Sequence, residues 1–255
     1  MGRILMKKLT IAALLPLALL VTSFGAQAAT SDGKNFAVSA GWAHIMPQGT
    51  KQGVNSTSPF PAFNSFNSDA GFELKNADTA EFKLDYLVND NVTVGLILGV
   101  PPKVDIQGKG QLLAGNLNLD GFSKVGDVKV YSPVLTGKYT FGAVNNKFRP
   151  YVGAGFMYAS FRDFKLNPEV NAKIAPLGGT ISNVDIDDAV APVAFIGADY
   201  NITPNWFATA SVSYVHLSTH ANLNVVNPAN VTFVQGSSKI EINPIVTYLG
   251  LGYRF

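Results

Sequence analysis

The chain has 255 residues, of which 47% are hydrophobic and 14% charged, so it is slightly more apolar than an average soluble domain. Its 19 basic and 17 acidic residues nearly balance, and no basic run follows the N-terminus, which argues against binding to nucleic acid. The chain contains no cysteine, so its stability does not rest on disulfide bonds.

The first predicted element is a secretion signal over residues 1–28. A basic start is followed by the apolar stretch Leu9–Val21 and by the small-residue motif Ala26-Gln27-Ala28. This three-part pattern is typical of a cleaved signal peptide. A permanent N-terminal membrane anchor is the alternative, but the apolar stretch is short and contains Pro16. We therefore expect an exported protein whose mature chain, residues 29–255, forms one domain.

The rest of the chain alternates apolar and polar residues with a period of two, as β-strands do. Eight segments reach or exceed the roughly 9 to 11 residues that cross a membrane as a tilted strand. They are predicted near Asn35–Ile45, Ala77–Leu87, Val92–Pro102, Val130–Phe141, Phe148–Phe161, Ala189–Ile202, Trp206–Val215 and Ile240–Phe255. The pattern predicts an all-β fold, an eight-stranded antiparallel transmembrane β-barrel.

Aromatic residues and loop lengths orient this barrel. The aromatic residues at one end of the strands predict a girdle at the lipid boundary: Tyr86, Phe141, Phe148, Tyr200, Trp206, Tyr253 and Phe255. Short links at that end alternate with four long ones, near residues 47–76, 103–129, 162–188 and 216–239. Short periplasmic turns and long extracellular loops are typical of barrels in the bacterial outer membrane. A water-soluble eight-stranded barrel with an internal ligand site is the alternative, but it leaves the girdle and the terminal Phe255 unexplained.

The interior of an eight-stranded barrel is filled by side chains, so a wide aqueous pore is not expected. Near the periplasmic end the inward positions carry charges of both signs, at Glu81, Lys83, Asp85, Lys138, Arg149, Asp199 and Arg254. Because buried charges persist when they are paired, we interpret this set as an ion-pair plug of the lumen. Filling of the interior without any effect on solutes explains the same residues equally well.

Toward the extracellular end the inward residues become apolar, which is the lining expected of a site for a hydrophobic ligand. The predicted substrate-binding residues are Ile97, Val134, Met157, Phe161, Val193, Phe195, Val215 and Val246. Packing of a purely structural barrel is the alternative interpretation.

Prolines are concentrated in the outer half of the predicted strands, at Pro47, Pro101, Pro102, Pro133, Pro192 and Pro244. Proline donates no backbone hydrogen bond and is normally excluded from central strands. We therefore expect a weakly paired wall at that height and a sideways exit for an apolar solute. The strand pair with Pro101, Pro102 and Pro133 is the predicted lateral opening, unless these prolines only shape bulges.

Three segments resemble the OmpW/AlkL family of outer-membrane proteins: FRPYVGAGF (148–156), GADYNITPNW (197–206) and INPIVTYLGLGYRF (242–255). The resemblance implies an eight-stranded barrel that takes up small hydrophobic molecules through an apolar lumen with a lateral opening. The terminal aromatic residue also resembles the signal that the barrel-assembly machinery recognises. The expected partners are therefore that machinery, outer-membrane lipids and small apolar solutes.

Two other functions are compatible with parts of the sequence. His216-Leu217-Ser218 resembles the His-x-Ser pair of outer-membrane lipid A deacylases, but alternation places His216 on the outward face without a clear acidic partner. We expect no enzyme, no cofactor and, since metal-ligand spacing is missing, no metal. A structural or adhesive barrel is the second alternative, acting through long loops such as the apolar run Asn222–Val234.

Overall fold

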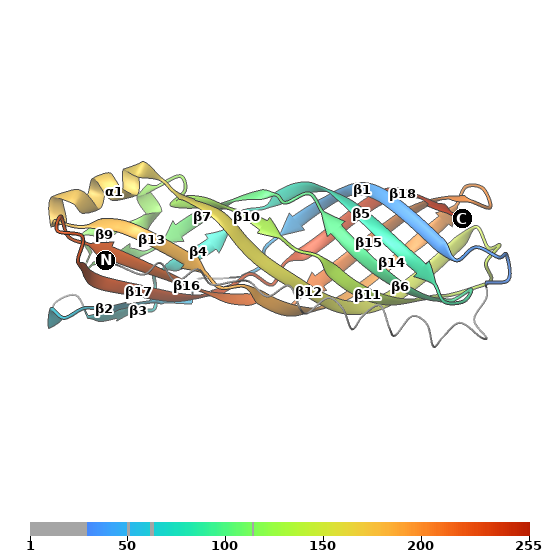
Figure 1. The fold of residues 1–255 in the computed structure, drawn as a ribbon, viewed down its shortest axis with the longest axis horizontal. Coiled ribbons are helices and arrows are strands. Elements are labelled where there is room, and N and C mark those ends of the chain that lie inside the picture. The colour runs from blue at the N-terminus through green and yellow to red at the C-terminus, as the bar shows by residue number, and fades with distance from the viewer. Residues whose placement is uncertain (1–29, 50–51, 62–63, 114) are drawn as a thin grey trace, which may run out of the picture.

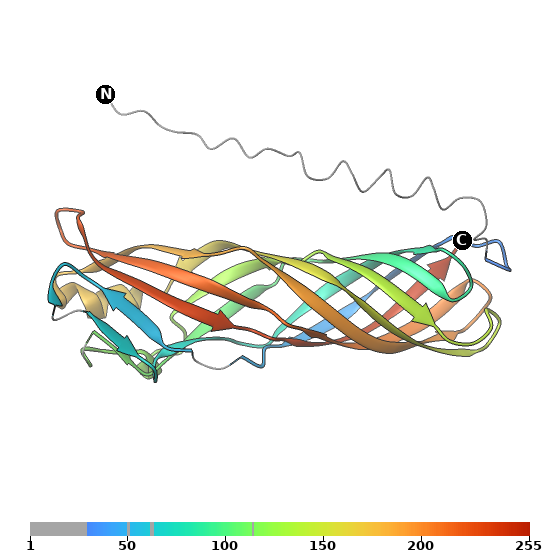
Figure 2. The ribbon, with the colours of Figure 1, turned by 90° about the horizontal axis from the view of Figure 1, so that it is seen from below.

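The computed structural model describes residues 30–49, 52–61, 64–113 and 115–255. It is a long β-structure in which a barrel continues into an extracellular half of strands and a short helix (Figure 1). The C-terminus and the short turns lie at one end, and the helix lies at the other (Figures 1 and 2). The predicted signal peptide lies outside the described residues and stays a prediction.

Eight antiparallel strands close the barrel, as the sequence predicted. They are β1 (Phe36–Met46), β5 (Ala77–Leu87), β6 (Val92–Gly99), β11 (Val134–Thr140), β12 (Phe148–Leu166), β14 (Ala189–Asn201), β15 (Trp206–Val215) and β18 (Ile245–Arg254). Each strand pairs with the next one in this order, and β1 pairs with β18 from Ala37 opposite Arg254 to Met46 opposite Ile245. The closure gives each of the eight strands a partner on both sides, as the absence of water in the membrane requires.

Two rings of aromatic side chains bound the apolar outer surface of the barrel. The predicted periplasmic ring is present, and it is knit together by contacts such as Trp206 with Tyr253, whose ring centroids lie 5.1 Å apart. A second ring, which was not predicted, lies toward the extracellular side, where Trp42, Tyr131, Tyr158 and Tyr214 are exposed. Aromatic residues favour both membrane interfaces, so the two rings mark the height of the lipid-facing band.

The four predicted long loops are largely regular structure. One sheet joins the outer end of β12 to β10 (Gly126–Tyr131), β7 (Lys103–Lys109) and β4 (Gly71–Leu74). A second sheet has five strands, in the order β13 (Thr180–Ile186), β16 (Ser218–Val226), β17 (Thr232–Glu241), β2 (Val54–Thr57) and β3 (Ser65–Asn67). A small hairpin pairs β8 (Gln111–Leu112) with β9 (Leu117–Asn118). Buried apolar residues from both sheets form one cluster with the upper part of the barrel interior.

The helical segments also lie in this extracellular half. They are α1 (Pro168–Ile174) and the 3-10 turns η2 (Leu119–Gly121) and η3 (Ala175–Leu177). Asn167 begins α1, because its side-chain oxygen accepts a hydrogen bond from the backbone of Glu169 and proline occupies the next position. Gly178, with φ of +77°, ends the segment in the left-handed conformation that glycine tolerates. No helix among the described residues is long and apolar enough to cross a membrane.

Three predicted strands are shorter than expected, and each begins or ends within two residues of a proline. The third barrel strand ends at Gly99 instead of Pro102, the fourth begins at Val134 instead of Val130, and the eighth begins at Ile245 instead of Ile240. The missing parts belong to the extracellular strands β10 and β17 or to the links. The physical reason is that proline removes a ladder donor and turns the chain, so one long predicted strand becomes two.

Candidate functional site

A cavity in the middle of the barrel brings together most of the predicted substrate-binding residues. The space between its lining atoms is about 740 Å³ when the part that is open to solvent is included. Seven of the eight predicted residues line it: Ile97, Val134, Met157, Val193, Phe195, Val215 and Val246. The eighth, Phe161, is buried higher up in the apolar cluster and does not line this cavity.

Strand register explains why these side chains meet. Val134 on β11 lies opposite Ile97 on β6 and Met157 on β12. Because side chains alternate between the two faces of a strand, residues opposite one another point to the same side, here the lumen. Val193 likewise lies opposite Val215 of β15.

Glycine makes room for this packing on β12. A Cβ atom on Gly153 would lie 2.2 Å from the ring of Phe195, and one on Gly155 would lie 2.1 Å from the carbonyl oxygen of Leu135. Real side-chain atoms do not approach this closely, so both positions require glycine for the observed strand spacing and for the position of the Phe195 ring.

The floor of the cavity is charged. Lys138 lies 2.7 Å from a carboxylate oxygen of Asp85, and Lys83 lies 3.4 Å from a carboxylate oxygen of Glu81. The Lys83 ammonium also lies 3.6 Å from the centre of the Tyr248 ring, which is a favourable cation–π geometry. Apolar and charged residues therefore share one cavity, with the apolar part on the extracellular side.

A second charged layer lies closer to the periplasm. Arg254 lies 3.0 Å from Asp199, and both side chains are almost completely buried. Arg149 differs from the prediction, because its guanidinium donates to the backbone carbonyls of Asp90 and Gly142 and forms no ion pair with a carboxylate of the described residues. Six of the seven predicted plug residues thus form three ion pairs, while Arg149 forms hydrogen bonds with two periplasmic turns.

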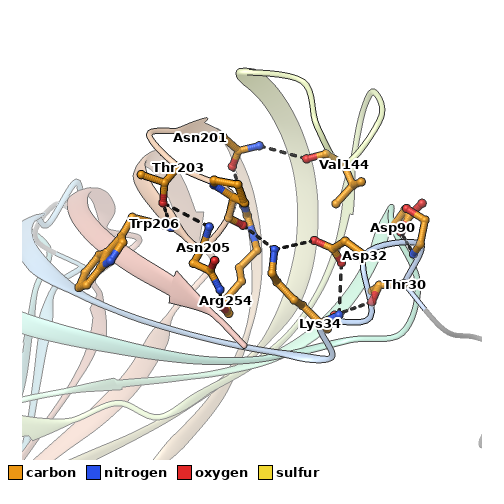
Figure 3. Close-up of polar contacts among 12 residues, drawn as sticks. Thr30, Asp32, Lys34, Asp90, Val144, Asn201, Thr203, Asn205, Trp206 and Arg254 are labelled. Carbon is orange, nitrogen blue, oxygen red and sulfur yellow. Dashed lines mark hydrogen bonds and ion pairs between the residues drawn. The ribbon is translucent and has the colours of Figure 1, made fainter.

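The periplasmic mouth is held by a network that sequence reasoning missed (Figure 3). The segment before β1 crosses it: the backbone of Ser31 donates to Asp90 at 2.7 Å, and Lys34 donates to the carbonyl of Pro204 at 2.7 Å. Asn201 donates to the carbonyl of Val144 at 3.2 Å. Asn and Asp in short turns were the available signal, since such residues bond nearby backbone groups. The three turns are therefore tied to each other and to the chain before β1.

The barrel wall is interrupted where Pro101 and Pro102, which follow β6, lie near Pro133, which precedes β11. The ladder between these strands ends at Ile97 and Val134, and pairing resumes where the backbone of Val130 donates to the carbonyl of Pro102 at 3.1 Å. Four residues on one side and three on the other lie between these points, about 13 Å of strand. We call this stretch, residues 98–101 and 131–133, the β6–β11 seam; it contains Pro101 and Pro133 and is bordered by Pro102.

The other prolines do not weaken the wall, which corrects the broader expectation. The carbonyl of Pro192 accepts a hydrogen bond from His216, and that of Pro244 accepts one from Val215, each at 3.0 Å. Pro47 follows the end of β1, where Gln48 bonds the backbone of Ile242 at 2.9 Å. Hydrogen bonding between the strands at these three prolines continues into the extracellular half. The weakly paired part of the wall that the structure shows is therefore the β6–β11 seam.

The rival catalytic pair lies on the outer surface. The side chains of His216 and Ser218 are exposed, while Leu217 between them is buried at 4% exposure. Both residues therefore face away from the lumen, as alternation predicted. In the part of the chain that the structure describes, no group of three or more acidic and histidine residues is arranged to hold a metal ion.

Comparison with known proteins gives consistent matches. A family model described as the OmpW family matches residues 32–255. Outer membrane protein W of Vibrio cholerae is 30% identical over 221 residues, which cover 87% of this chain and 88% of that protein. The dibenzothiophene metabolism operon protein PahQ of Pseudomonas aeruginosa is 25% identical over 174 residues, 68% of this chain and 70% of the relative. The crystal structure of OprG from Pseudomonas aeruginosa has a TM-score of 0.71 and 22% identity, covering 87% of this chain and 96% of that one, and supports the fold alone.

Proposed function

The chain belongs to the OmpW family of outer-membrane barrels, and we propose that it admits small hydrophobic molecules passively across the bacterial outer membrane. The solute enters an apolar lumen and leaves sideways into the membrane. The observation that carries the proposal is the lumen cavity, which is apolar toward the outside, charged toward the periplasm, and bordered by the interrupted β6–β11 seam.

The two possible exits differ in free energy. An apolar solute gains about 25 cal/mol for each Å² of surface that leaves water for the lumen. Exit to the periplasm would return that surface to water and would first carry it past Lys138, Asp85 and the Arg254–Asp199 pair. Exit into lipid keeps the surface in an apolar medium. Sideways release therefore needs only a path through the wall, and we assign that path to the seam with Pro101, Pro102 and Pro133.

The name of one relative supports this substrate class. PahQ is named as a protein of a dibenzothiophene metabolism operon, and dibenzothiophene is a small, apolar aromatic molecule. The lumen of this chain offers Ile97, Val193 and Phe195 to such a solute. The proposed partners are thus small apolar solutes, outer-membrane lipids around the apolar band, and the barrel-assembly machinery at Phe255.

Two rival functions gain less support. The apolar run that suggested an adhesive surface contributes Val225 and Val234 to the interior, with 3% and 2% exposure, and leaves Val231 on the surface. His216 and Ser218 lie outside the cavity, so we propose neither catalysis nor a cofactor for it.

Uptake measurements test the proposal. We would measure accumulation of size-matched apolar and polar solutes in cells that lack a protein of this family, and in vesicles whose outer leaflet is lipopolysaccharide. The native barrel is compared with Val193→Asp and Ile97→Asp, which place a charge in the apolar part of the lumen. Val231→Asp is the matched control, because the same change falls on an exposed extracellular position.

The native barrel should raise apolar uptake selectively, the two lumen variants should abolish it while remaining folded, and the control should keep it. If the native protein gives no uptake above membranes without it, the transport proposal is wrong and the extracellular surface becomes the place to seek a partner.

A further inference from the structure

A second cavity lies between the two sheets of the extracellular half, in the region that the sequence presented as loops. The space between its lining atoms is about 650 Å³ when the part that is open to solvent is included. Strands of both sheets, the outer end of β12 and helix α1 all contribute to its walls. Representative lining residues are Phe72, Leu117, Phe164, Val170, Ile186 and Leu223. We call this cavity the outer chamber.

The outer chamber offers almost no polar group to a solute. Of its lining residues, only Ser237 and Ser238 have polar side chains. The Ser238 hydroxyl is already engaged, since it donates to the carbonyl of Gly53 at 2.7 Å. The lumen cavity below is different, because Lys83, Asp85 and other polar side chains line its floor. A solute with a hydroxyl or a charge can find a partner in the lumen but scarcely any in the outer chamber.

The two cavities share no lining residue and are separated by buried apolar side chains. Along β12 the order is Met157 in the lumen, Phe161 between, and Phe164 in the outer chamber. Between β15 and β16, Leu217 follows Val215 of the lumen and precedes Ala221 of the outer chamber. Between β17 and β18, Ile242 follows Ile240 of the outer chamber and precedes Val246 of the lumen. Phe161, Leu217 and Ile242 are 6%, 4% and 4% exposed. We call these three residues the septum.

We propose that the outer chamber is a solute-binding site in its own right, which receives uncharged molecules without hydrogen-bonding groups before they pass the septum into the lumen. The inference rests on the proposed function and narrows its substrate class to hydrocarbons and similar molecules. Its physical basis is desolvation, because a polar group buried without a partner loses its hydrogen bonds to water and regains none. The outer chamber then selects by polarity, and it does so before the polar floor of the lumen is reached. Phe161, predicted as a substrate-binding residue, becomes part of the passage between the sites.

Methyl NMR of the whole chain in lipid nanodiscs tests the proposal, with cyclohexane and cyclohexanol as probes. Methyl signals of Val170 and Ile186 report on the outer chamber, and those of Val193 and Val246 report on the lumen. Val212, which faces the lipid, reports on partitioning into the membrane. We expect saturable shifts of the chamber signals with cyclohexane, and binding of cyclohexanol there to be roughly tenfold weaker or more.

A filling variant links the outer chamber to the route. Ala221 lines the chamber, and Ala221→Phe should occupy it, removing the chamber shifts and lowering uptake at least severalfold while the lumen signals still respond. The matched control is His220→Phe on the exposed neighbouring position, which should behave as native. Two-dimensional spectra show directly whether each variant is folded.

The results separate this inference from the proposed function. If the native chamber signals change only in proportion to those of Val212, or if cyclohexanol binds as well as cyclohexane, the outer chamber is not the proposed site, even when uptake is intact. If Ala221→Phe is folded and takes up solute at the native rate, the chamber is not on the route. Absence of native uptake with saturable chamber shifts would instead overturn the transport function and leave the binding site.

Discussion

Replacement of Arg254 by methionine should destabilise the barrel by about 3 to 5 kcal/mol, because it leaves the Asp199 carboxylate buried without its cation. The Arg254 and Asp199 side chains are 6% and 4% exposed, and their closest charged atoms lie 3.0 Å apart. Arg254 also donates to the side-chain oxygen of Asn201 and lies 4.1 Å from the centre of the Phe207 ring. The other oxygen of Asp199 has no hydrogen-bond partner among the described residues, so little remains to stabilise the charge.

Urea unfolding in lipid vesicles, followed by the fluorescence of the two tryptophans, measures this effect. With a slope of about 2 kcal/mol per molar urea, the midpoint should fall by roughly 1.5 to 2.5 M. The double variant Arg254→Met, Asp199→Leu should recover most of the loss, because it removes both charges. As a control, Lys129→Met removes a cation from an exposed pair with Asp163 and should leave the urea midpoint nearly unchanged.

The reasoning is refuted if Arg254→Met costs less than about 1 kcal/mol, or if the double variant is no more stable than the single one. Either result would mean that Asp199 is hydrated from the periplasmic side and is not a buried charge. The charged floor would then be a weaker barrier than the proposed sideways exit requires.

Three further outcomes are expected. Gly41→Ala should prevent folding, because its Cβ would lie 2.2 Å from a carbonyl oxygen of β18. Gly137→Ala, with open space around its Cβ, should fold normally in a gel-shift assay, and equal folding of the two variants would contradict the strand spacing. Gly99→Phe should fill the lumen side of the β6–β11 seam and slow the arrival of an apolar dye in the membrane, compared with Gly137→Phe; an unchanged rate would place the exit elsewhere. Hydrogen bonds from Arg162 lower the pKa of Asp188, so the stability from this pair is present above the ordinary pKa of about 3.9 and is lost as the pH falls through the lower folded value. The difference in urea midpoint between pH 6 and pH 3 should therefore be smaller in Asp188→Asn than in the native chain, and an equal difference would show that the pair contributes nothing.

The lumen site was largely predictable from sequence, because both its apolar and its charged residues follow from alternation along single strands. Once Val193 is placed inward, every second residue of β14 is placed with it, and the pairing of neighbouring strands brings Val215 and Met157 to the same cavity. Phe161 lies above the lumen cavity, because β12 extends well beyond it. Alternation predicts which face of a strand a residue is on, but not the height at which it lies.

The outer chamber was invisible in the sequence. Its walls are short strands that pair across large separations in the chain, such as β2 with β17, where Thr57 lies opposite Gln235. A strand of four residues such as β2 carries too little alternation to be distinguished from a loop. The sequence showed an apolar run that includes Val225 and Val234. It did not show that these residues would pack against residues of the other sheet.

The sequence by itself determined that the chain is an eight-stranded outer-membrane barrel with an apolar outer surface, because lipid demands an apolar side chain at every second position and every strand repeats this local rule. Tertiary structure alone decided which charges pair, where the wall is interrupted, and how the extracellular half folds. These features depend on the register between strands and on contacts between distant segments. The interruption at the β6–β11 seam exists only when both strands are aligned, and the outer chamber exists only when two sheets face each other.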